Sequence, residues 1–178
     1  MSRTIQDSAT LAIRSERTGD EAGIAQLVGS AFETEKEVEL ISTLRDSGCF
    51  YLSLVAEQLE PGNEHGKPGK IVGHILFTPV QIDDDNSLKL VGLAPLSVLP
   101  DKQGKGIGSK LIKEGLRRCR IHNIDVVVVL GNPDYYGQFD FAPASAFGIE
   151  SVYEVEDKYF MLQELNKSAL DRYIFDYS

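Results

Sequence analysis

Glycines at alternate positions mark the segment Leu96–Ser109, which reads LSVLPDKQGKGIGS. Gly104, Gly106 and Gly108 separate a run of apolar residues, typical of a strand end, from helically spaced apolar residues that follow. A turn from a strand into a helix offers free backbone N–H groups and the positive end of the helix dipole, and it therefore binds anions, especially phosphates. One C-cap glycine would be enough for a plain connection, so the pattern favours a phosphate-binding turn.

Two common phosphate-binding motifs do not fit this turn. The Walker loop G-x-x-x-x-G-K-[ST] fails because Leu99 stands at its first glycine position. The dinucleotide fingerprint G-x-G-x-x-G fails because Ser109 and Leu111 stand where its last glycine would be in the two alignments that the glycines allow. A nucleotide hydrolase and a dinucleotide-dependent oxidoreductase are therefore disfavoured, and the pattern Q-x-x-G-x-G at residues 103–108 is left.

The elements around the turn predict an α/β chain with a mixed sheet. Strands are predicted where aliphatic and aromatic residues run or alternate, and helices where apolar residues recur every three to four positions. Pro95 cannot donate a ladder hydrogen bond, so it predicts a bulge or an edge. A strand, a helix and an apolar strand follow one another over residues 88–130, which favours a parallel crossover. Predicted strands span residues 10–14, 51–57, 70–81, 88–99, 125–130, 145–150 and 158–165.

Capping signals place the helices. The patterns Thr18-x-x-Glu21 and Thr34-x-x-Glu37 are capping boxes and predict the starts of two helices after the first strand. Helices are further predicted from residue 106 to about 119, over residues 133–139 and in a tail helix at 167–178. The apolar spacing of the tail predicts that it packs down, on its own domain or on a partner subunit, and motivates the expectation of a homodimer.

Length and charge narrow the class of protein. A chain of 178 residues suits one domain over residues 1–178, with a polar leader at 1–9. The net charge of -9 opposes binding to nucleic acid or to an anionic membrane and suits a cationic substrate. Because the chain has neither an apolar core of signal-peptide length nor an apolar run long enough to cross a bilayer, a cytoplasmic location is expected.

Cysteine and histidine usage predicts no metal site. The cysteines, Cys49 and Cys119, have no metal-ligand spacing, and both are expected to be free thiols. The three histidines, at positions 65, 74 and 122, are equally dispersed.

Two segments together resemble a known family. They are Gly92–Leu116, GLAPLSVLPDKQGKGIGSKLIKEGL, and Gly131–Phe141, GNPDYYGQFDF. Both are similar to the GNAT superfamily of N-acetyltransferases, in its bacterial YhbS-type branch. The resemblance implies the GNAT fold, with a central, mostly antiparallel sheet of six to seven strands and about four helices. It also implies transfer of an acetyl group from acetyl-CoA to a primary amine of a small molecule or protein.

The resemblance also implies a coenzyme site. The backbone at three strand residues would hydrogen-bond the pantetheine arm, and the amides of the following turn would wrap the pyrophosphate. The side-chain amide of Asn132 is implied as a further coenzyme ligand, although Asn before Pro133 suits a helix N-cap equally well. The strand residues are Leu96, Ser97 and Val98, and the turn residues are Gln103, Gly104, Lys105, Gly106, Ile107, Gly108 and Ser109.

Attack of an amine on a thioester needs an acid for the leaving thiolate and a donor for the developing oxyanion. The resemblance implies Tyr136 as the acid, because it stands five residues before Phe141; Asp140 replaces the glycine that precedes this Phe in the family. Tyr135 is the alternative acid, and a packing role for both tyrosines stays open. The oxyanion donor implied by the family is a main-chain amide near Val98.

The base and the acceptor site are less determined. His74, inside a predicted strand, is a candidate base, and a structural role is its alternative. Glu33 and Glu37 lie at the joint between the two early helices, which the resemblance places at the acceptor pocket; a solvated face is their alternative. No Cys or Ser nucleophile stands in an identifiable motif, so direct attack in a ternary complex is expected. A non-catalytic module that binds or senses acyl-CoA is the alternative function.

Overall fold

A computed structural model of the chain describes residues 9–32, 36–46, 52–60, 68–82, 85–151, 154–167 and 169–171. One seven-stranded sheet runs through the molecule in the order β1-β2-β3-β4-β5-β7-β6. Every neighbouring pair is antiparallel except β4 and β5, so the expected mostly antiparallel sheet is confirmed. The strands are β1 Thr10–Ser15, β2 Leu52–Leu59, β3 Lys70–Ile82, β4 Asp85–Val98, β5 Val126–Leu130, β6 Ala142–Pro143 and β7 Phe160–Glu164.

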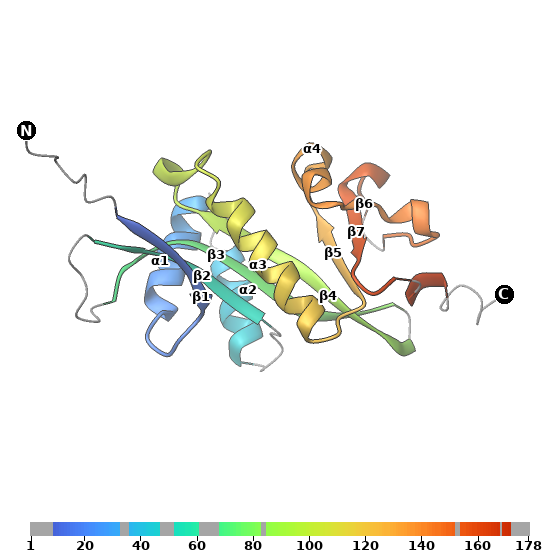
Figure 1. The fold of residues 1–178 in the computed structure, drawn as a ribbon, viewed down its shortest axis with the longest axis horizontal. Helices are drawn as coiled ribbons and strands as arrows, with labels where there is room; N and C mark the ends of the chain where they lie inside the picture. The colour runs from blue at the N-terminus through green and yellow to red at the C-terminus, as the bar shows by residue number, and fades with distance from the viewer. Residues whose placement is uncertain are drawn as a thin grey trace, which may run out of the picture.

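Helices cover both faces of the sheet (Figure 1). One face packs against α1 and α2, where Ile24, Val28 and Ile41 meet Val55 and Leu76 of the strands. The opposite face packs against α3, which connects β4 to the parallel strand β5 and so confirms the expected crossover. The helices are α1 Glu21–Ala31, α2 Lys36–Asp46, α3 Ile107–Ile121 and α4 Pro133–Tyr136.

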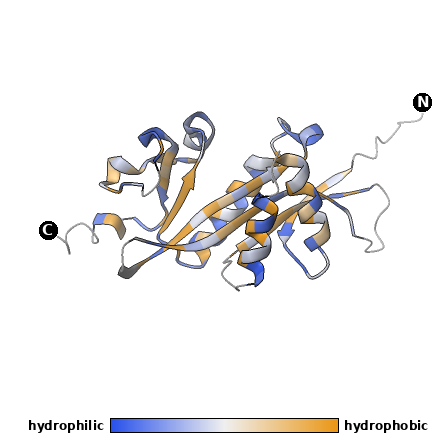
Figure 2. Cartoon of the chain, turned by 180° about the vertical axis from the view of Figure 1, so that it is seen from behind, coloured by the Kyte–Doolittle hydropathy of each residue, from blue (hydrophilic) through white to orange (hydrophobic). Residues whose placement is uncertain are grey.

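The larger core lies between the sheet and α3. Phe77 of β3 and Leu111 of α3 are fully buried there, and Gly115 lets the ring of Phe77 lie directly against the helix backbone. Figure 2 shows the matching pattern, with apolar residues concentrated along the central strands and the inward helix faces. Because α3 is fixed by this contact, the turn that precedes it is held in a defined place over β4.

Two local predictions are wrong. The capping box at Thr18 does not form: α1 begins at Glu21 behind Asp20, whose carboxylate accepts from the backbone N–H of Arg17 at 2.7 Å and pairs with Arg14 at 2.6 Å. The second capping box includes Thr34, which lies outside the described residues.

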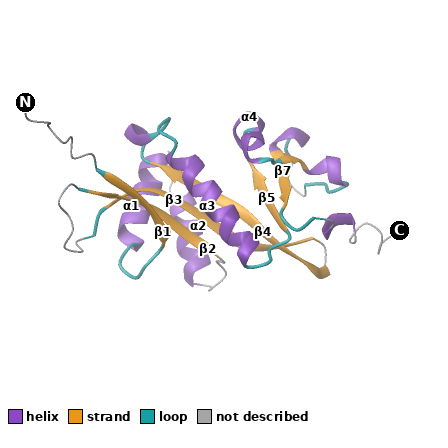
Figure 3. Ribbon diagram, in the orientation of Figure 1, coloured by secondary structure: helices purple, strands orange, loops and turns teal. Residues whose placement is uncertain are grey.

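The strand predicted over residues 145–150 is also absent. Ala144–Phe147 forms a short 3-10 helix that ends at Gly148, because the N–H of Gly148 bonds back to the carbonyl of Ser145 at 3.0 Å. The strand that pairs with β7 is the two-residue β6 just before it. Further 3-10 turns span Pro100–Lys102, Gly137–Phe139 and Asp157–Tyr159. Figure 3 shows the last two on the same side of the molecule as β7, whereas the first precedes α3.

The described part of the tail packs on its own domain. Ala169 and Leu170 are buried, and Leu170 joins a cluster with Leu90 and Leu162. The rest of the predicted tail helix lies outside the described residues, as does the polar leader up to residue 8, so the homodimer stays a prediction. No helix in the described ranges is long and apolar enough to cross a membrane.

Candidate active site

Strands β4 and β5 separate at the centre of the sheet. They pair only from Leu90 to Gly92 against Val126 to Val128, and in the described chain no pairing between them continues beyond that point. β4 goes on alone along β3, and Pro95 lies in an irregularity where Leu93 and Leu96 oppose Phe77 and Ile75. The bulge expected at Pro95 is therefore confirmed. The edge of β4 that faces β5 is left with backbone groups that the sheet does not use.

The glycine-rich turn follows directly. Gly104 and Gly106 have φ angles of +71° and +77°, in the left-handed region where glycine is favoured. Gly106 is the N-cap residue of α3, and its carbonyl accepts from the N–H of Lys110 at 3.1 Å. The first N–H groups of α3 thus end at the turn without helical partners, in the arrangement that binds an anion.

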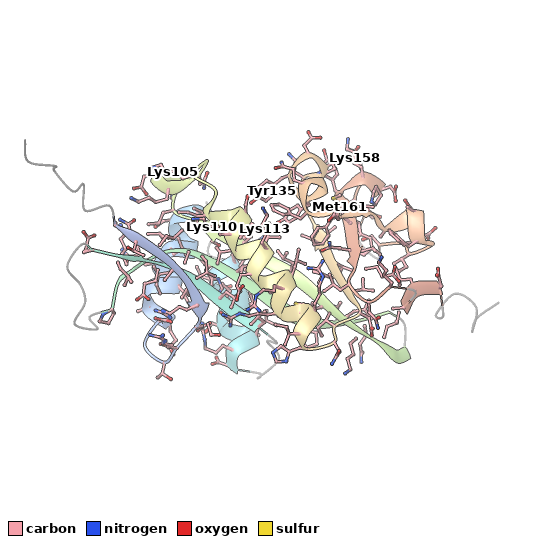
Figure 4. All side chains as sticks on the ribbon, in the orientation of Figure 1. Lys105, Lys110, Lys113, Tyr135, Lys158 and Met161 are labelled. Carbon is pink, nitrogen blue, oxygen red and sulfur yellow. The ribbon has the colours of Figure 1, made fainter. Side chains whose placement is uncertain are left out.

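A pocket of about 480 Å³ lies over this turn. It joins the end of β4 to the first turn of α3 and brings together most of the residues predicted to hold the coenzyme. Lys102 and Tyr135 line it as well, although neither was assigned to coenzyme binding from the sequence. Figure 4 shows Tyr135 between α4 and α3. The predicted residues in the lining are Leu96, Val98, Gln103, Gly104, Gly106, Ile107, Gly108 and Ser109.

Three residues of the predicted coenzyme set are not in that lining. The side chain of Ser97 is buried on the opposite face of β4, which leaves only its backbone available toward the groove. Lys105 is exposed and donates to the carbonyl of Asp101 at 2.8 Å. Asn132 is the N-cap of α4, where its Oδ1 accepts from the N–H of Asp134 at 2.8 Å, so the capping alternative is confirmed and the coenzyme contact stays a prediction.

The two adjacent tyrosines occupy different surroundings. The Tyr135 hydroxyl lies against Gly108, where an added Cβ would be 2.5 Å away, and burial raises the pKa of Tyr135 while a hydrogen bond with the Ser109 side chain opposes that rise. Tyr136 is buried, packs on Gly131 at the end of β5 and makes an edge-to-face contact with Phe141 at 5.7 Å.

Burial raises the pKa of Tyr136 to about 12, and the neighbouring Tyr135 adds to the rise. The Tyr136 hydroxyl is therefore protonated at any physiological pH, as a proton donor must be before it acts. The packing alternative and the acid alternative are not exclusive, because a ring that packs along its edge can still present its hydroxyl.

His74 lies in β3 on the face that packs against α1 and α2. Its side chain is fully buried, and this burial lowers its pKa to about 4, with a smaller contribution from the charge of Arg45. Nε2 lies 2.9 Å from the hydroxyl of Ser53, whereas Nδ1 has no hydrogen-bond partner. His74 is paired across the strands with Ser97, whose hydroxyl is also buried without a partner.

The hydrogen bonds continue from Ser53 to the surface. The Ser53 hydroxyl donates to the carboxylate of Glu16, which pairs with Arg45 of α2 at 2.6 Å. These two charged residues and Ser53 line a second pocket of about 390 Å³. Sequence reasoning missed Ser53, Glu16 and Arg45, since a single Ser, Glu or Arg in separate elements carries no recognisable pattern.

The acidic residues expected at the acceptor site are only partly placed. Glu37 lies in the first turn of α2 and is half-buried, whereas Glu33 lies outside the described residues. Within the described ranges, no cluster of His, Cys, Asp and Glu side chains could hold a metal ion.

Comparison with known proteins places this geometry in a family. Residues 12–144 match the acetyltransferase (GNAT) domain. The uncharacterized N-acetyltransferase YhbS of Escherichia coli K12 is 31% identical over 159 residues, which cover 89% of this chain and 90% of that protein. The uncharacterized N-acetyltransferase YjhQ of the same strain is 33% identical over 158 residues, 85% of this chain and 82% of that protein.

Solved structures of GNAT proteins have the same fold as this chain. E. coli YhbS in complex with CoA superposes with a TM-score of 0.83 at 30% identity, over 92% of this chain and 86% of that one. A GNAT acetyltransferase from Brucella melitensis in complex with acetyl-CoA gives 0.70 at 35% identity, over 88% and 89%. The chain therefore belongs to the GNAT family and is an N-acetyltransferase.

Proposed function

We propose that this chain moves the acetyl group of acetyl-CoA to a primary amine by direct attack, with the coenzyme bound in the pocket between β4 and α3. The observation that carries the proposal is the convergence, in this pocket, of the open edge of β4 and the N-terminal turn of α3. The first suits the amides of a pantetheine arm, and the second suits a pyrophosphate. The GNAT proteins of E. coli and B. melitensis were solved with CoA and acetyl-CoA, which supports the same ligand here.

The chemistry of the pocket fits the coenzyme. Space is open around Gly104 and Gly106, so the backbone there is accessible to a bulky anion. Lys102 lines the pocket and adds positive charge to the N–H groups of the turn. Apolar Leu96 and Val98 line the part of the pocket along β4, which suits the alkyl segments of a pantetheine arm.

The position of the tyrosines favours Tyr136 as the acid. The hydroxyl of Tyr135 reaches the first turn of α3, at the phosphate end of the pocket. Tyr136 packs on Gly131, at the end of β5, where that strand leaves β4. Since the pantetheine arm separates the pyrophosphate from the thioester, the leaving thiol belongs near Tyr136. In this arrangement Tyr136 donates its proton to the thiolate, and an amide near Val98 stabilises the oxyanion.

His74 is the proposed base. Its Nδ1 lone pair has no hydrogen-bond partner, and burial lowers its pKa, so the imidazole is neutral at physiological pH and the lone pair is free. The acidic chain and the carboxylates of α2, including Glu37, suit an acceptor that is a cation in solution.

The first test is calorimetric titration of the purified chain with acetyl-CoA, desulfo-CoA and NAD. We expect both coenzyme A species to bind and NAD not to bind. Absence of binding to either coenzyme A species would overturn the assignment of the pocket.

The second test measures thiol release from acetyl-CoA with a panel of polyamines, amino acids, aminoglycosides and amine-bearing peptides. Tyr136→Phe should lower kcat by about 100-fold, the usual size of general acid catalysis, and leave coenzyme affinity intact. Tyr135→Phe, the matched control, should weaken coenzyme binding more than it slows transfer. Coenzyme binding without transfer to any amine would favour a sensing module, and a kinetically competent acetylated enzyme would contradict direct attack.

A further inference from the structure

Positive charge is concentrated in one part of this acidic chain. Residues 101–120, which span the glycine-rich turn and most of α3, contain seven Lys and Arg residues and two Asp and Glu residues, a net charge of +5. The whole chain has a net charge of -9, so the rest of the molecule is strongly negative. A local positive field on an acidic protein attracts anions to that place.

Two of these cations make no ion pair or hydrogen bond within the described residues. They are Lys110 and Lys113, and both are exposed. Glu114, the acidic residue of α3, pairs with Arg117 at 2.7 Å and with Arg118 at 2.7 Å. The charges of Lys110 and Lys113 are therefore left without a partner on the surface of the helix.

Both lysines stand on the side of α3 that begins at the glycine-rich turn. Spacings of four and seven residues place Lys110 and Lys113 on the same side of the helix as its N-cap, Gly106, which lines the proposed coenzyme pocket. They lie about 6 Å and about 10 Å along the helix axis from Gly106. Figure 4 shows both side chains on the N-terminal half of α3. The two ammonium groups therefore extend the pocket along the exposed face of the helix.

The position of Lys110 is unfavourable in the free protein. The positive end of a helix dipole favours acidic residues in the first turn and disfavours cations there. The first turn of α3 contains no acidic residue, and Lys110 is the fourth residue of the helix. Functional sites often retain an arrangement that costs stability. A bound anion would supply the negative charge that this end of α3 lacks.

Coenzyme A carries an anion beyond its pyrophosphate. The 3′-oxygen of its ribose bears a phosphate monoester, and such a group has about -1.5 to -2 charges at pH 7. The ribose places this phosphate one sugar ring away from the pyrophosphate. The pantetheine arm leaves the pyrophosphate on the other side and runs, in the proposed arrangement, along Leu96 and Val98. The 3′-phosphate therefore belongs on the solvent side of the turn.

Lysines stand on both sides of the turn, and only the pair on α3 is free to bind. Lys105 donates to the carbonyl of Asp101 at 2.8 Å, and Lys102 lies 4.0 Å from the carboxylate of the same residue. A phosphate between Lys110 and Lys113 gains charge-assisted hydrogen bonds without breaking any that the described chain already makes.

We propose that Lys110 and Lys113 bind the 3′-phosphate of coenzyme A and make the pocket selective for CoA over 3′-dephospho-CoA. The inference rests on the proposed function, in the part that places the pyrophosphate at the turn. The two lysines fix the adenosine end of the coenzyme, whereas the reaction takes place at its thioester end. They therefore control the affinity for the coenzyme and leave kcat for transfer unchanged.

Calorimetric titration of the full chain with CoA and with 3′-dephospho-CoA tests the assignment. The unaltered protein should bind CoA at least about tenfold more tightly, the effect of one hydrogen bond to a charged group. Lys110→Gln and Lys113→Gln should each reduce this preference, and the double variant should bind the two ligands equally. Lys113→Arg keeps the charge and should keep the preference. Because the lysines are exposed, the preference should shrink as salt rises from about 0.05 M to about 0.5 M.

Arg120→Gln is the matched control. Arg120 is exposed on the same helix and has the same charge, but it lies about 20 Å along the helix axis from Gly106. Its removal should leave the preference intact, because solvent and salt screen its charge over that distance. A loss of preference as large as that in Lys113→Gln would indicate a general field in place of a binding site and would overturn the assignment.

Lys110→Glu separates the loss of a binding site from general damage to the fold. An acidic residue in the first turn should stabilise α3, so the Tm of the free protein should rise by up to about 4 °C. The same variant should lose its preference for CoA. A preference for CoA that survives this reversal of charge would overturn the assignment.

The outcomes separate the subsite from the proposed function. Equal affinity for the two ligands in the unaltered protein, or a preference that persists in the double variant, would overturn the subsite while the coenzyme pocket stands. Absence of binding to either ligand would overturn the pocket and the subsite together. The expected preference for CoA without transfer to any amine of the panel would overturn the proposed function and support the subsite.

Discussion

Alanine substitutions at Gly106 and Gly108 test the proposed phosphate-binding turn, because an added side chain has a different effect at each position. Gly106 has a φ of +77° and open space around it, so Gly106→Ala should strain the backbone without a steric clash. Gly108 lies inside the first turn of α3, where an added Cβ would lie 2.5 Å from the Tyr135 hydroxyl and 3.7 Å from Leu96. Alanine at position 108 should therefore crowd the Tyr135 hydroxyl without straining the backbone.

The two variants should differ in stability. Gly106→Ala should lower the free energy of unfolding by about 1–2 kcal/mol, the cost of a left-handed residue with a side chain. That lowers Tm by roughly 2–8 °C for a domain of this size. Gly108→Ala gains up to about 1 kcal/mol of helix propensity, which offsets the displacement of the Tyr135 hydroxyl, so Tm should change little. Coenzyme affinity should fall more in Gly108→Ala than in Gly106→Ala, because the new methyl group at 108 projects into the pocket.

Calorimetric titration with CoA and thermal unfolding, run on both variants, measure the contrast. Gly108→Ala should lose at least about tenfold in coenzyme affinity, which is about 1.4 kcal/mol, while Gly106→Ala should lose less. Unchanged CoA affinity in Gly108→Ala would refute the assignment of the pocket as the coenzyme site. An unchanged Tm in Gly106→Ala would refute the strain argument and leave the pocket untouched.

Further predictions concern groups away from the turn. Burial in the folded state lowers the pKa of His74 to about 4, so as pH falls the unfolded state takes up the proton first. The contribution of His74 to the free energy of unfolding is therefore complete above about pH 6.5 and falls by about 3 kcal/mol as pH drops toward 4. His74→Asn should flatten the pH dependence of the urea-unfolding free energy over that window, and an unchanged pH dependence would contradict the burial of His74. Burial raises the pKa of Cys119 to about 12, so peptide mapping after mild alkylation should find it unmodified in the folded protein. Asn132→Ala should cost about 1 kcal/mol through loss of the α4 cap, and Asn132→Ser, which also caps, should recover it; loss of CoA affinity in Asn132→Ser would indicate a coenzyme contact instead.

The pocket proposed for the coenzyme was largely predictable from the sequence because it is built mostly from a contiguous segment of the chain. Residues 96–109 form a strand end, a turn and a helix start, and each of these has a local rule: Pro95 interrupts a ladder, and Gly106 adopts a left-handed cap. The predictions that failed are also local, but they compete with contacts that no local pattern shows. Asp20 binds Arg14 across the sheet edge and so replaces Thr18 at the start of α1.

The surroundings of His74, the proposed base, are different in kind, because they are set by strand register. Ser53 and His74 are 21 residues apart in sequence, and they meet only because β2 and β3 pair with Val55 opposite His74. A slip of one residue in this pairing would turn Ser53 to the α3 face and break its hydrogen bond with His74. Pairing of these strands already shifts register between Ala56 and Glu57, and the partly buried ion pair of Glu57 with Arg14 at 2.7 Å lies at that shift. Arg14→Leu should therefore weaken the Ser53–His74 hydrogen bond, which the nitrogen chemical shift of His74 Nε2 reports, whereas a substitution that spares the register, such as Glu21→Gln, should not.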